Sequence, residues 1–184
     1  MSHPCEKFYF VRHGQTDANL NNLAAGSGWD IELNEAGLAQ AKALAESESI
    51  ENCLDVKTIC VSPMARALQT AEAINQVLQA PLVIIDELKE WYLGDWEKGS
   101  WSDLPSLYAP GTHPPNGESQ IEFGTRVAAG LAAALRQPSP IMIVAHGGVW
   151  HAVSRILSLP KGSIDNCAMR IVSRTSPSEP WTLV

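Results

Sequence analysis

The sequence predicts an α/β sandwich with a largely parallel sheet. Short apolar runs typical of buried strands alternate along the chain with segments whose apolar residues recur at helical spacing. Two of these runs end abruptly in histidine and glycine, at Arg12-His13-Gly14 and at His146-Gly147-Gly148. Parallel strands bring their carboxyl ends to one edge of a sheet, where open α/β folds bind ligands. We therefore expect the residues that follow these strands to share one site.

Size and composition suit a single domain spanning residues 1–184. Hydrophobic residues make up 45% of the chain and charged residues 18%, an ordinary globular mix. The formal net charge of -7 argues against a nucleic-acid partner, which would require a basic face. A local pocket for an anion remains compatible with this charge, because a few arginines can be focused in one cleft.

The four cysteines form no C-x-x-C pair, so neither a zinc site nor a redox motif is indicated. Cys60 lies within an apolar run and is interpreted as a small buried hydrophobe. The N-terminus lacks the pattern of a signal peptide, and no apolar run is long enough to span a bilayer. We expect a cytoplasmic protein without membrane contact.

The first third of the chain predicts a strand over residues 7–11, a loop over 20–32 and then a helix. The loop is rich in Asn, Gly and Ala and would cover the end of the first strand. Asn34 is the expected N-cap of the helix, which should run to about residue 48. Its apolar stripe would consist of Leu38, Ala41, Leu44 and Ala45.

A second strand is expected over residues 58–61, followed by a helix that starts at Ser62-Pro63. Apolar residues then recur at helical spacing from Met64 to Leu78. Arg66 would lie in the first turn of that helix, where the helix dipole disfavours a cation. A bound anion explains such an arginine better than simple solvation does.

A third strand over residues 82–85 precedes a stretch, 86–99, in which acids and large aromatics interleave without a period. We interpret this stretch as a loop or short helical turn. Aromatic rings beside a carboxyl group shield it from water, which favours the protonated form that a general acid requires. Alternatively, Trp91, Tyr92 and Trp96 only pack the loop while the acids are solvated.

The remaining elements follow in order. Residues 101–108 predict a short helix, and 109–117 a Pro/Gly loop. Ser119 and Glu122 match a capping box, which opens a helix with Phe123, Val127 and Leu131 on its apolar face. Residues 141–145 form a second fully apolar strand before His146, and the helix that follows should end near residue 160. A last strand is expected over 168–173, with a loose surface tail after it.

We expect a strongly anion-binding pocket at this edge of the sheet. It would combine the side chains of Arg12, His13, Arg66 and His146 with the helix starts at Pro63 and Gly147. Phosphate fits best, because its charge and oxygens match many donors at once. The chain contains no Walker-type G-x-x-x-x-G-K-[ST] run. The two histidines lack metal-ligand spacing, so we expect no metal and no cofactor.

The sequence resembles the histidine phosphatase superfamily, also called phosphoglycerate-mutase-like, over nearly its whole length. Six blocks in family order carry the resemblance: VRHGQT (11–16) with Asn19, LNEAG (33–37), SPMARALQTA (62–71), LKE (88–90) with GDWE (94–97), NGES (116–119) and VAHGG (144–148). Any one block is weak evidence, whereas the full ordered set is specific. The resemblance implies a three-layer α/β/α sandwich of the phosphoglycerate-mutase-like type.

The resemblance also implies roles for individual residues. His13 corresponds to the nucleophile that becomes phosphohistidine, and Glu90 to the acid that protonates the leaving oxygen and then activates water. Arg12, Arg66 and His146 correspond to the phosphate-binding set, with His146 also counted among the catalytic residues. Asn19 matches an accessory phosphate contact, and Gly147 would add its backbone N–H.

This chain departs from the family pattern at Lys98, an extra residue between Trp96-Glu97 and Gly99 where the family often has Trp-Glu-Gly. The inserted residue puts the geometry of the local loop in question. We interpret Trp150 as a packing residue. His3, His113 and His151 are interpreted as surface or structural residues.

The predicted function is hydrolysis of a small phosphorylated metabolite. Bisphosphoglycerate-dependent mutases of the family usually carry a longer insertion than the short interval 100–115, so a small cap built from loops 20–32 and 91–115 favours a phosphatase. An inactive phosphate-binding module is disfavoured by the complete residue set, and a phosphohistidine-protein phosphatase by the acid-bearing loop. The natural substrate and the oligomeric state stay open.

Overall fold

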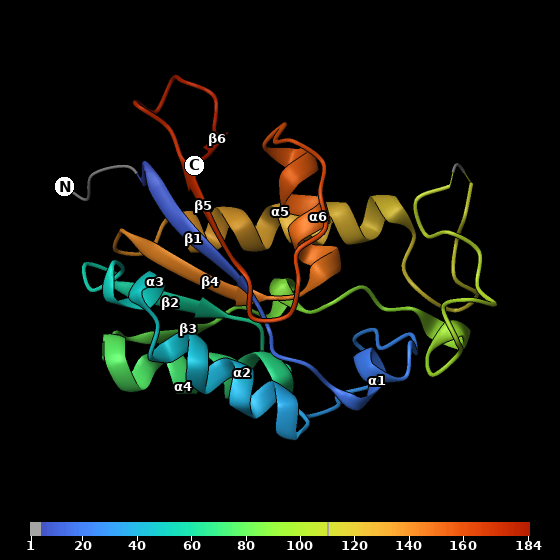
Figure 1. The fold of residues 1–184 in the computed structure, drawn as a ribbon. Helices are drawn as coiled ribbons and strands as arrows, with labels where there is room; N and C mark the ends of the chain where they lie inside the picture. The colour runs from blue at the N-terminus through green and yellow to red at the C-terminus, as the bar shows by residue number, and fades with distance from the viewer. Residues whose placement is uncertain (1–4, 110) are drawn as a thin grey trace.

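The computed structural model describes residues 5–109 and 111–184, which form a three-layer α/β/α sandwich (Figure 1). The sheet has six strands in the order β3-β2-β4-β1-β5-β6. The first four are mutually parallel, and β5 and β6 are antiparallel additions at one edge. The strands are β1 (Lys7–Arg12), β2 (Thr58–Val61), β3 (Leu82–Ile84), β4 (Ile141–Ala145), β5 (Met169–Ser173) and β6 (Thr182–Leu183). The predicted fold class is confirmed.

Helices cover both faces of the sheet (Figure 1). On one face lie α2 (Glu35–Ala45), α3 (Glu48–Glu51) and α4 (Ala65–Leu78), and on the other α5 (Gln120–Leu135) and α6 (Gly147–Ile156). The short helix α1 (Asp17–Leu20) follows β1, and single 3₁₀ turns η1 (Asp86–Leu88) and η2 (Gly94–Trp96) lie in the acid-rich stretch. No helix in the described part of the chain is long and apolar enough to cross a membrane.

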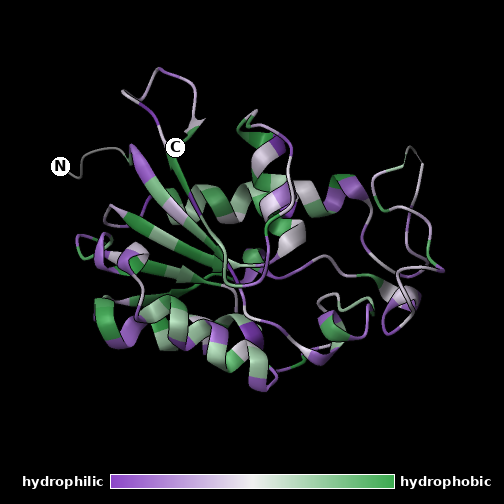
Figure 2. Ribbon diagram, in the orientation of Figure 1, coloured by the Kyte–Doolittle hydropathy of each residue, from purple (hydrophilic) through white to green (hydrophobic). Residues whose placement is uncertain are grey.

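Two hydrophobic cores form because successive side chains of a strand point to opposite faces. In β1, Phe8 and Phe10 pack towards α5 and α6, whereas Tyr9 and Val11 pack towards α2 and α4. The central strands are therefore apolar on both faces, as Figure 2 shows. Cys60 belongs to this interior, and burial raises the pKa of its thiol to about 12, consistent with a buried hydrophobe.

The pairing of β1 with β4 places the two histidine turns side by side. Arg12 lies opposite Ala145 in this parallel pair, and the His13 N–H donates to the Ala145 carbonyl at 3.0 Å. Both chains leave the sheet at the same edge immediately afterwards. The predicted convergence of His13 and His146 thus follows from a single register.

Two predicted helix boundaries are wrong. Helix α4 begins at Ala65 with Met64 as N-cap, so Ser62-Pro63 precedes the helix rather than opening it. The Ser62 hydroxyl lies 2.8 Å from Nε2 of His146 and serves the site instead of the helix. Helix α2 ends at Ala45, and α3 is a separate turn before residue 52.

The stripe of α2 is narrower than expected. Leu38, predicted on its buried face, is 51% exposed, whereas Ala41 and Ala45 are buried. The buried residues of α2, which packs against α4, are the small residues Gly37, Ala41 and Ala45.

Two further expectations fail near the surface. Residues 101–108 form turns instead of a helix, because Pro105 lacks an N–H and disfavours helical geometry at the residue before it. The tail is not loose, since β6 pairs with β5 and Trp181 packs edge-on against Phe8 with ring centroids 5.2 Å apart. Pro110, in the Pro/Gly loop, and His3 lie outside the described residues.

The capping box at the start of α5 gives a test of local stability. The Ser119 side chain accepts the Glu122 N–H, and the Glu122 carboxylate accepts the Ser119 N–H at 2.8 Å. Ser119→Ala should lower the free energy of unfolding by about 1 kcal/mol in urea titrations. Ser49→Ala, which changes an exposed serine of α3, should stay within about 0.5 kcal/mol of the parent. Equal effects of the two changes would contradict the capping role.

Candidate active site

A cavity of about 540 Å³ opens at the carboxyl ends of β1 and β4. Six of the seven predicted site residues line it: Arg12, His13, Asn19, Arg66, Glu90 and Gly147. The seventh, His146, is fully buried behind the cavity wall, with its ring centroid 5.1 Å from that of His13. The structure thus brings together residues that are up to 135 positions apart in the sequence, from Arg12 to Gly147.

The His13 ring is held in one tautomer by its own turn. Its Nδ1 lies 2.7 Å from the Gly14 carbonyl oxygen, which can only accept a hydrogen bond. Nδ1 therefore carries the proton, and Nε2 keeps its lone pair. Burial, together with the charges of Arg66 and Arg12, holds the pKa of His13 well below its ordinary value. The ring is neutral at neutral pH, as a nucleophile requires.

His146 is equally buried but lies one layer deeper. Its Nε2 is 2.8 Å from the Ser62 hydroxyl, while its buried Nδ1 has no hydrogen-bond partner among the described residues. Burial is the main cause that puts the pKa of His146 well below its ordinary value, and the charge of Arg66 adds to it. A neutral ring beside His13 can donate a hydrogen bond towards an anion in the cavity.

One buried guanidinium group, that of Arg66, and one partly buried group, that of Arg12, define the electrostatics of the site. Arg66 is 1% exposed and donates to backbone carbonyls of Ala25, Gly26 and Trp29 at 3.3 to 3.4 Å. Arg12 donates through Nη1 to the Ile164 carbonyl at 2.8 Å, and its buried Nε has no partner in the described chain.

Neither guanidinium forms an ion pair within 4.0 Å anywhere in residues 5–109 and 111–184. Burial lowers the pKa of both groups, although arginine stays charged in proteins. Carboxylates, Glu90 first among them, act on both groups only from beyond ion-pair distance, so the arrangement leaves room for an anion in direct contact. The prediction that Arg66 occupies the first turn of its helix beside an anion site agrees with this geometry.

Glu90 enters the cavity from the loop after β3 and is anchored by two backbone N–H groups. Its Oε1 accepts from Trp91 at 2.9 Å and its Oε2 from Gly148 at 3.0 Å. A Cβ atom at position 148 would overlap Glu90 Oε1, so a side chain at this position would displace the carboxylate. The sequence draws attention to Gly147 as an anion contact, whereas Gly148 has the tighter steric requirement.

The Glu90 segment is held from outside the cavity by Arg126 of α5, a residue that the sequence analysis missed. Arg126 donates to the carbonyls of Glu87, Lys89 and Glu90 at 2.9 to 3.1 Å. It also forms a bidentate pair with Glu118 at 2.7 Å. The signal was indirect, since Glu118 lies in the NGES block but Arg126 resembles any charge on an amphipathic helix.

Two further missed residues fix the backbone around His13. Thr70 of α4 accepts the Gly14 N–H at 3.0 Å and donates to the Arg66 carbonyl at 2.8 Å, which ties the two turns together. Asn166, after α6, donates to the His13 carbonyl at 2.9 Å and to Asn19 Oδ1 at 3.2 Å. Nothing in the sequence of 160–168 marks this contact, because it depends on the antiparallel return into β5.

His151 is partly exposed and packs on a neighbouring ring, which agrees with a surface or structural role. Its side chain lines the same cavity as His13, with its ring 3.9 Å from that of Tyr108. His113 is an exposed residue, as predicted, with Nε2 3.0 Å from the Gly117 carbonyl. Trp150 is a packing residue, as predicted, because it is buried with its ring 5.1 Å from Phe10.

The extra residue Lys98 is accommodated by a left-handed backbone conformation, with φ at 68°. Glu97, just before it, accepts the N–H groups of Gly28 at 2.8 Å and Leu93 at 3.2 Å. An isolated β-bridge between Leu23 and Ser100 adds a second link between the two loops. The insertion therefore leaves loops 20–32 and 91–115 joined beside the cavity.

No cluster of three or more His, Cys, Asp or Glu side chains that could hold a metal ion occurs among the residues that the structure describes. The cavity is lined by three cations (Arg12, Arg66 and Lys161), the imidazoles of His13 and His151, and the Glu90 carboxylate, and His146 lies behind its wall. Such a donor set is suited to an oxyanion.

The profile of the histidine phosphatase superfamily (branch 1) matches residues 8–179. The chain belongs to this superfamily. This histidine phosphatase is 38% identical over 146 residues to a Bacillus subtilis protein called uncharacterized phosphatase PhoE. The alignment covers 78% of this chain and 72% of that protein. It is 30% identical over 171 residues to the adenosylcobalamin/alpha-ribazole phosphatase of Salmonella typhimurium, covering 86% and 83%.

The same histidine phosphatase fold is seen in solved structures. Mycobacterial glucosyl-3-phosphoglycerate phosphatase, determined in complex with VO3, aligns with a TM-score of 0.80 at 28% identity over 98% of both chains. A structure called mycobacterial hydrolase 1 aligns with a TM-score of 0.82 at 26% identity, covering 97% of this chain and 96% of the other.

The lowered pKa values of His13 and His146 predict acid sensitivity. Below about pH 6.5 an unfolded chain protonates both imidazoles while the folded state keeps them neutral, so stability falls as the pH falls. The slope should approach about 1.4 kcal/mol per pH unit for each histidine. Urea unfolding between pH 7.5 and 5.5 should show a shallower slope for a His13→Asn/His146→Asn double variant. His113→Gln controls for removal of a surface histidine, and an unchanged slope in the double variant would refute the assignment.

Proposed function

We propose that this histidine phosphatase hydrolyses phosphomonoesters of small metabolites through a phosphohistidine formed on His13. One observation carries the proposal: the buried guanidinium of Arg66 and the partly buried guanidinium of Arg12 have no ion-pair partner within 4.0 Å among the described residues, and they border the same cavity as a neutral His13 whose Nε2 is free of the proton. The phosphoryl group of a substrate would supply the missing negative charge. Phosphoryl transfer relies mainly on such positioning and charge stabilisation.

In the first step, Nε2 of His13 attacks phosphorus as the bond from phosphorus to the ester oxygen breaks. Glu90 gives its proton to that departing oxygen, and the alcohol leaves. The anchoring of Glu90 by the N–H groups of Trp91 and Gly148 holds the carboxyl at one side of the cavity.

In the second step, water attacks the phosphohistidine and Glu90 removes a proton from it. The bond between phosphorus and nitrogen breaks, inorganic phosphate leaves, and His13 regains its neutral form. Arg12, Arg66 and His146 would hold the phosphoryl oxygens throughout. Asn19 and the backbone N–H of Gly147 at the start of α6 would complete the phosphate site.

The substrate is a small phosphorylated metabolite under this proposal. The named relatives include an alpha-ribazole phosphatase and a glucosyl-3-phosphoglycerate phosphatase, and both names point to compounds of that size. The chain would act as one domain, with loops 20–32 and 91–115 as a small cap. Their residues Leu23, Ala25, Trp101 and Tyr108 line the cavity.

A mutase is the second candidate, because it would use the same pocket. The short turns over residues 101–108 favour hydrolysis, since water can reach the phosphohistidine without a large cover. A mutase would isomerise 3-phosphoglycerate only in the presence of 2,3-bisphosphoglycerate, without release of inorganic phosphate. This result would reject the phosphatase in favour of the mutase.

Phosphate release from a panel of phosphorylated metabolites tests the nucleophile directly. His13→Ala should lower kcat by at least about 10³-fold on every substrate that the parent protein cleaves, because the covalent route is lost. Brief reaction with a ³²P-labelled substrate followed by an alkaline quench should label the parent protein and not the variant. Retention of most activity by His13→Ala would reject this mechanism.

A pair of glycine variants tests the placement of Glu90. Gly148→Ala should displace the carboxylate and lower kcat about 10- to 100-fold on alkyl phosphates, whose poor leaving groups need protonation. The loss on p-nitrophenyl phosphate, whose leaving group needs little protonation, should be smaller, and Glu90→Gln should show the same pattern. Gly124→Ala, at a helical position with open space around the new Cβ, should keep the parent activity. Equal losses on both substrate types would argue against an acid role for Glu90.

A further inference from the structure

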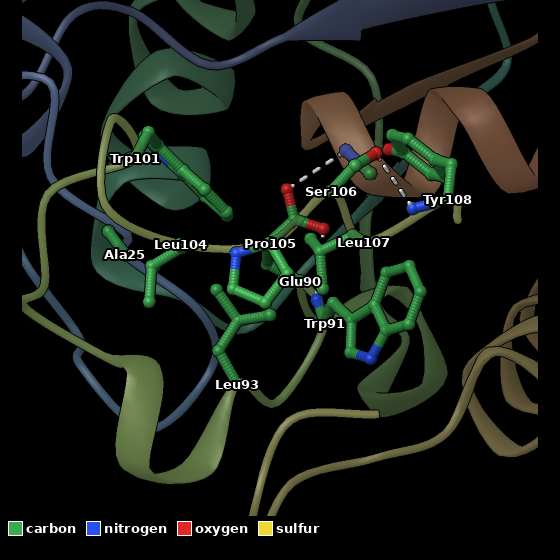
Figure 3. A pocket seen from close by; sticks show the side chains of 11 residues that line it. Ala25, Glu90, Trp91, Leu93, Trp101, Leu104, Pro105, Ser106, Leu107 and Tyr108 are labelled. Atoms are coloured by element: carbon green, nitrogen blue, oxygen red, sulfur yellow. Dashed lines mark hydrogen bonds between the residues drawn. The ribbon is translucent and has the colours of Figure 1, made fainter. Parts of the chain in front are cut away.

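A second cavity of about 340 Å³ adjoins the phosphate cavity at Glu90. The two share five lining residues: Ala25, Glu90, Trp101, Tyr108 and Gly148. The remaining wall of the second cavity consists mainly of apolar side chains, with Trp91, Leu93 and Leu104 among them. Figure 3 shows these side chains gathered around the Glu90 carboxylate.

The chemical character of the two cavities differs. Arg12, Arg66 and Lys161 line the phosphate cavity, whereas the residues given for the second cavity include Glu90 and no cation. A second anionic group of a substrate would meet no positive charge there. An apolar group would instead find tryptophan, leucine and proline side chains.

The wall is held in place before any ligand binds. Trp91 stacks on Phe123 of α5 with ring centroids 4.7 Å apart, and its indole N–H donates to the Glu118 carbonyl at 2.8 Å. Trp101 and Tyr108 nevertheless remain 37% and 48% exposed. Exposed aromatic surface beside a polar site is typical of ligand pockets.

We propose that this apolar cavity binds the alcohol portion of the substrate, and that the preferred substrates are phosphomonoesters of alcohols with an aromatic or bulky apolar group. The inference rests on the proposed function. A phosphoryl group held by Arg12 and Arg66, with its ester oxygen turned towards Glu90, directs the organic group past that carboxylate into the second cavity. Trp101 and Leu104 are then specificity-determining residues.

Comparison of 2-phenylethyl phosphate with ethyl phosphate tests binding of the organic group. Their leaving alcohols have similar basicity, so a difference in kcat/KM reflects binding and not intrinsic reactivity. The kcat/KM for 2-phenylethyl phosphate should exceed that for ethyl phosphate by about 10- to 100-fold, since burying a phenyl ring favours binding to that extent. The kcat/KM for 3-phosphoglycerate should stay below that for 2-phenylethyl phosphate. A ratio near one for the two alkyl phosphates would overturn the proposal.

Substitutions in the wall of the apolar cavity test whether that cavity causes the difference in kcat/KM between 2-phenylethyl and ethyl phosphate. Leu104→Asn and Trp101→Ala should each reduce the ratio of kcat/KM for the two alkyl phosphates by about threefold to tenfold, mainly through KM for the phenyl compound. Leu38→Ala removes an exposed leucine of α2 that does not line either cavity and should leave the ratio unchanged. Partial misfolding lowers both rates together and leaves their ratio intact.

The outcomes distinguish the two proposals. If the parent protein releases phosphate from ethyl and 2-phenylethyl phosphate equally well, and Leu104→Asn and Trp101→Ala do not change the ratio, the apolar site is rejected while the phosphatase stands. If neither compound nor any member of the metabolite panel yields phosphate, the proposed function itself fails.

Discussion

The parallel pairing of β1 with β4 is the interaction on which the rest of the site depends. Its register places Arg12 opposite Ala145, so the chain turns out of the sheet at His13 and at His146 side by side. Because both strands are buried on both faces, a shift of one residue would turn the side chains of a whole strand to the other core. Packing of the two apolar cores therefore fixes the strand register, and with it the relative position of His13 and His146.

Beside His13 and His146 the fold places two arginine side chains wholly or partly away from solvent, which lowers its stability. Arg66 is buried and Arg12 partly buried, and within the described chain both donate to backbone carbonyls instead of carboxylates. Burial is the main cause that lowers the pKa values of His13 and His146, and the same positive charges lower them further. Under the proposed function, the charges that would hold an oxyanion also help to keep the free imidazole of His13 unprotonated.

The acid is positioned by a separate mechanism. Glu90 lies on a loop without regular structure, yet Arg126 and Glu118 hold the backbone of that loop and the N–H groups of Trp91 and Gly148 hold its carboxylate. The aromatic residues that surround it serve two purposes: Trp91 packs on Phe123 within the core, whereas Trp101 and Tyr108 face the cavities. Packing, one of the two alternatives considered for the stretch 86–99, is thus seen for Trp91.

The sequence by itself determined the fold class, five of the six strands and six of the residues that line the phosphate cavity. Apolar periodicity and strand-end motifs are local properties of the chain, and the family resemblance added Asn19 and Glu90. Only the tertiary structure decided which partners hold those residues: Thr70, Asn166, Arg126 and the steric need for Gly148 arise from contacts between distant segments. It also moved the start of α4 from Ser62 to Ala65, since His146, 84 residues away, takes the Ser62 hydroxyl. Local patterns identify chemical groups, whereas packing across the sheet decides what those groups touch.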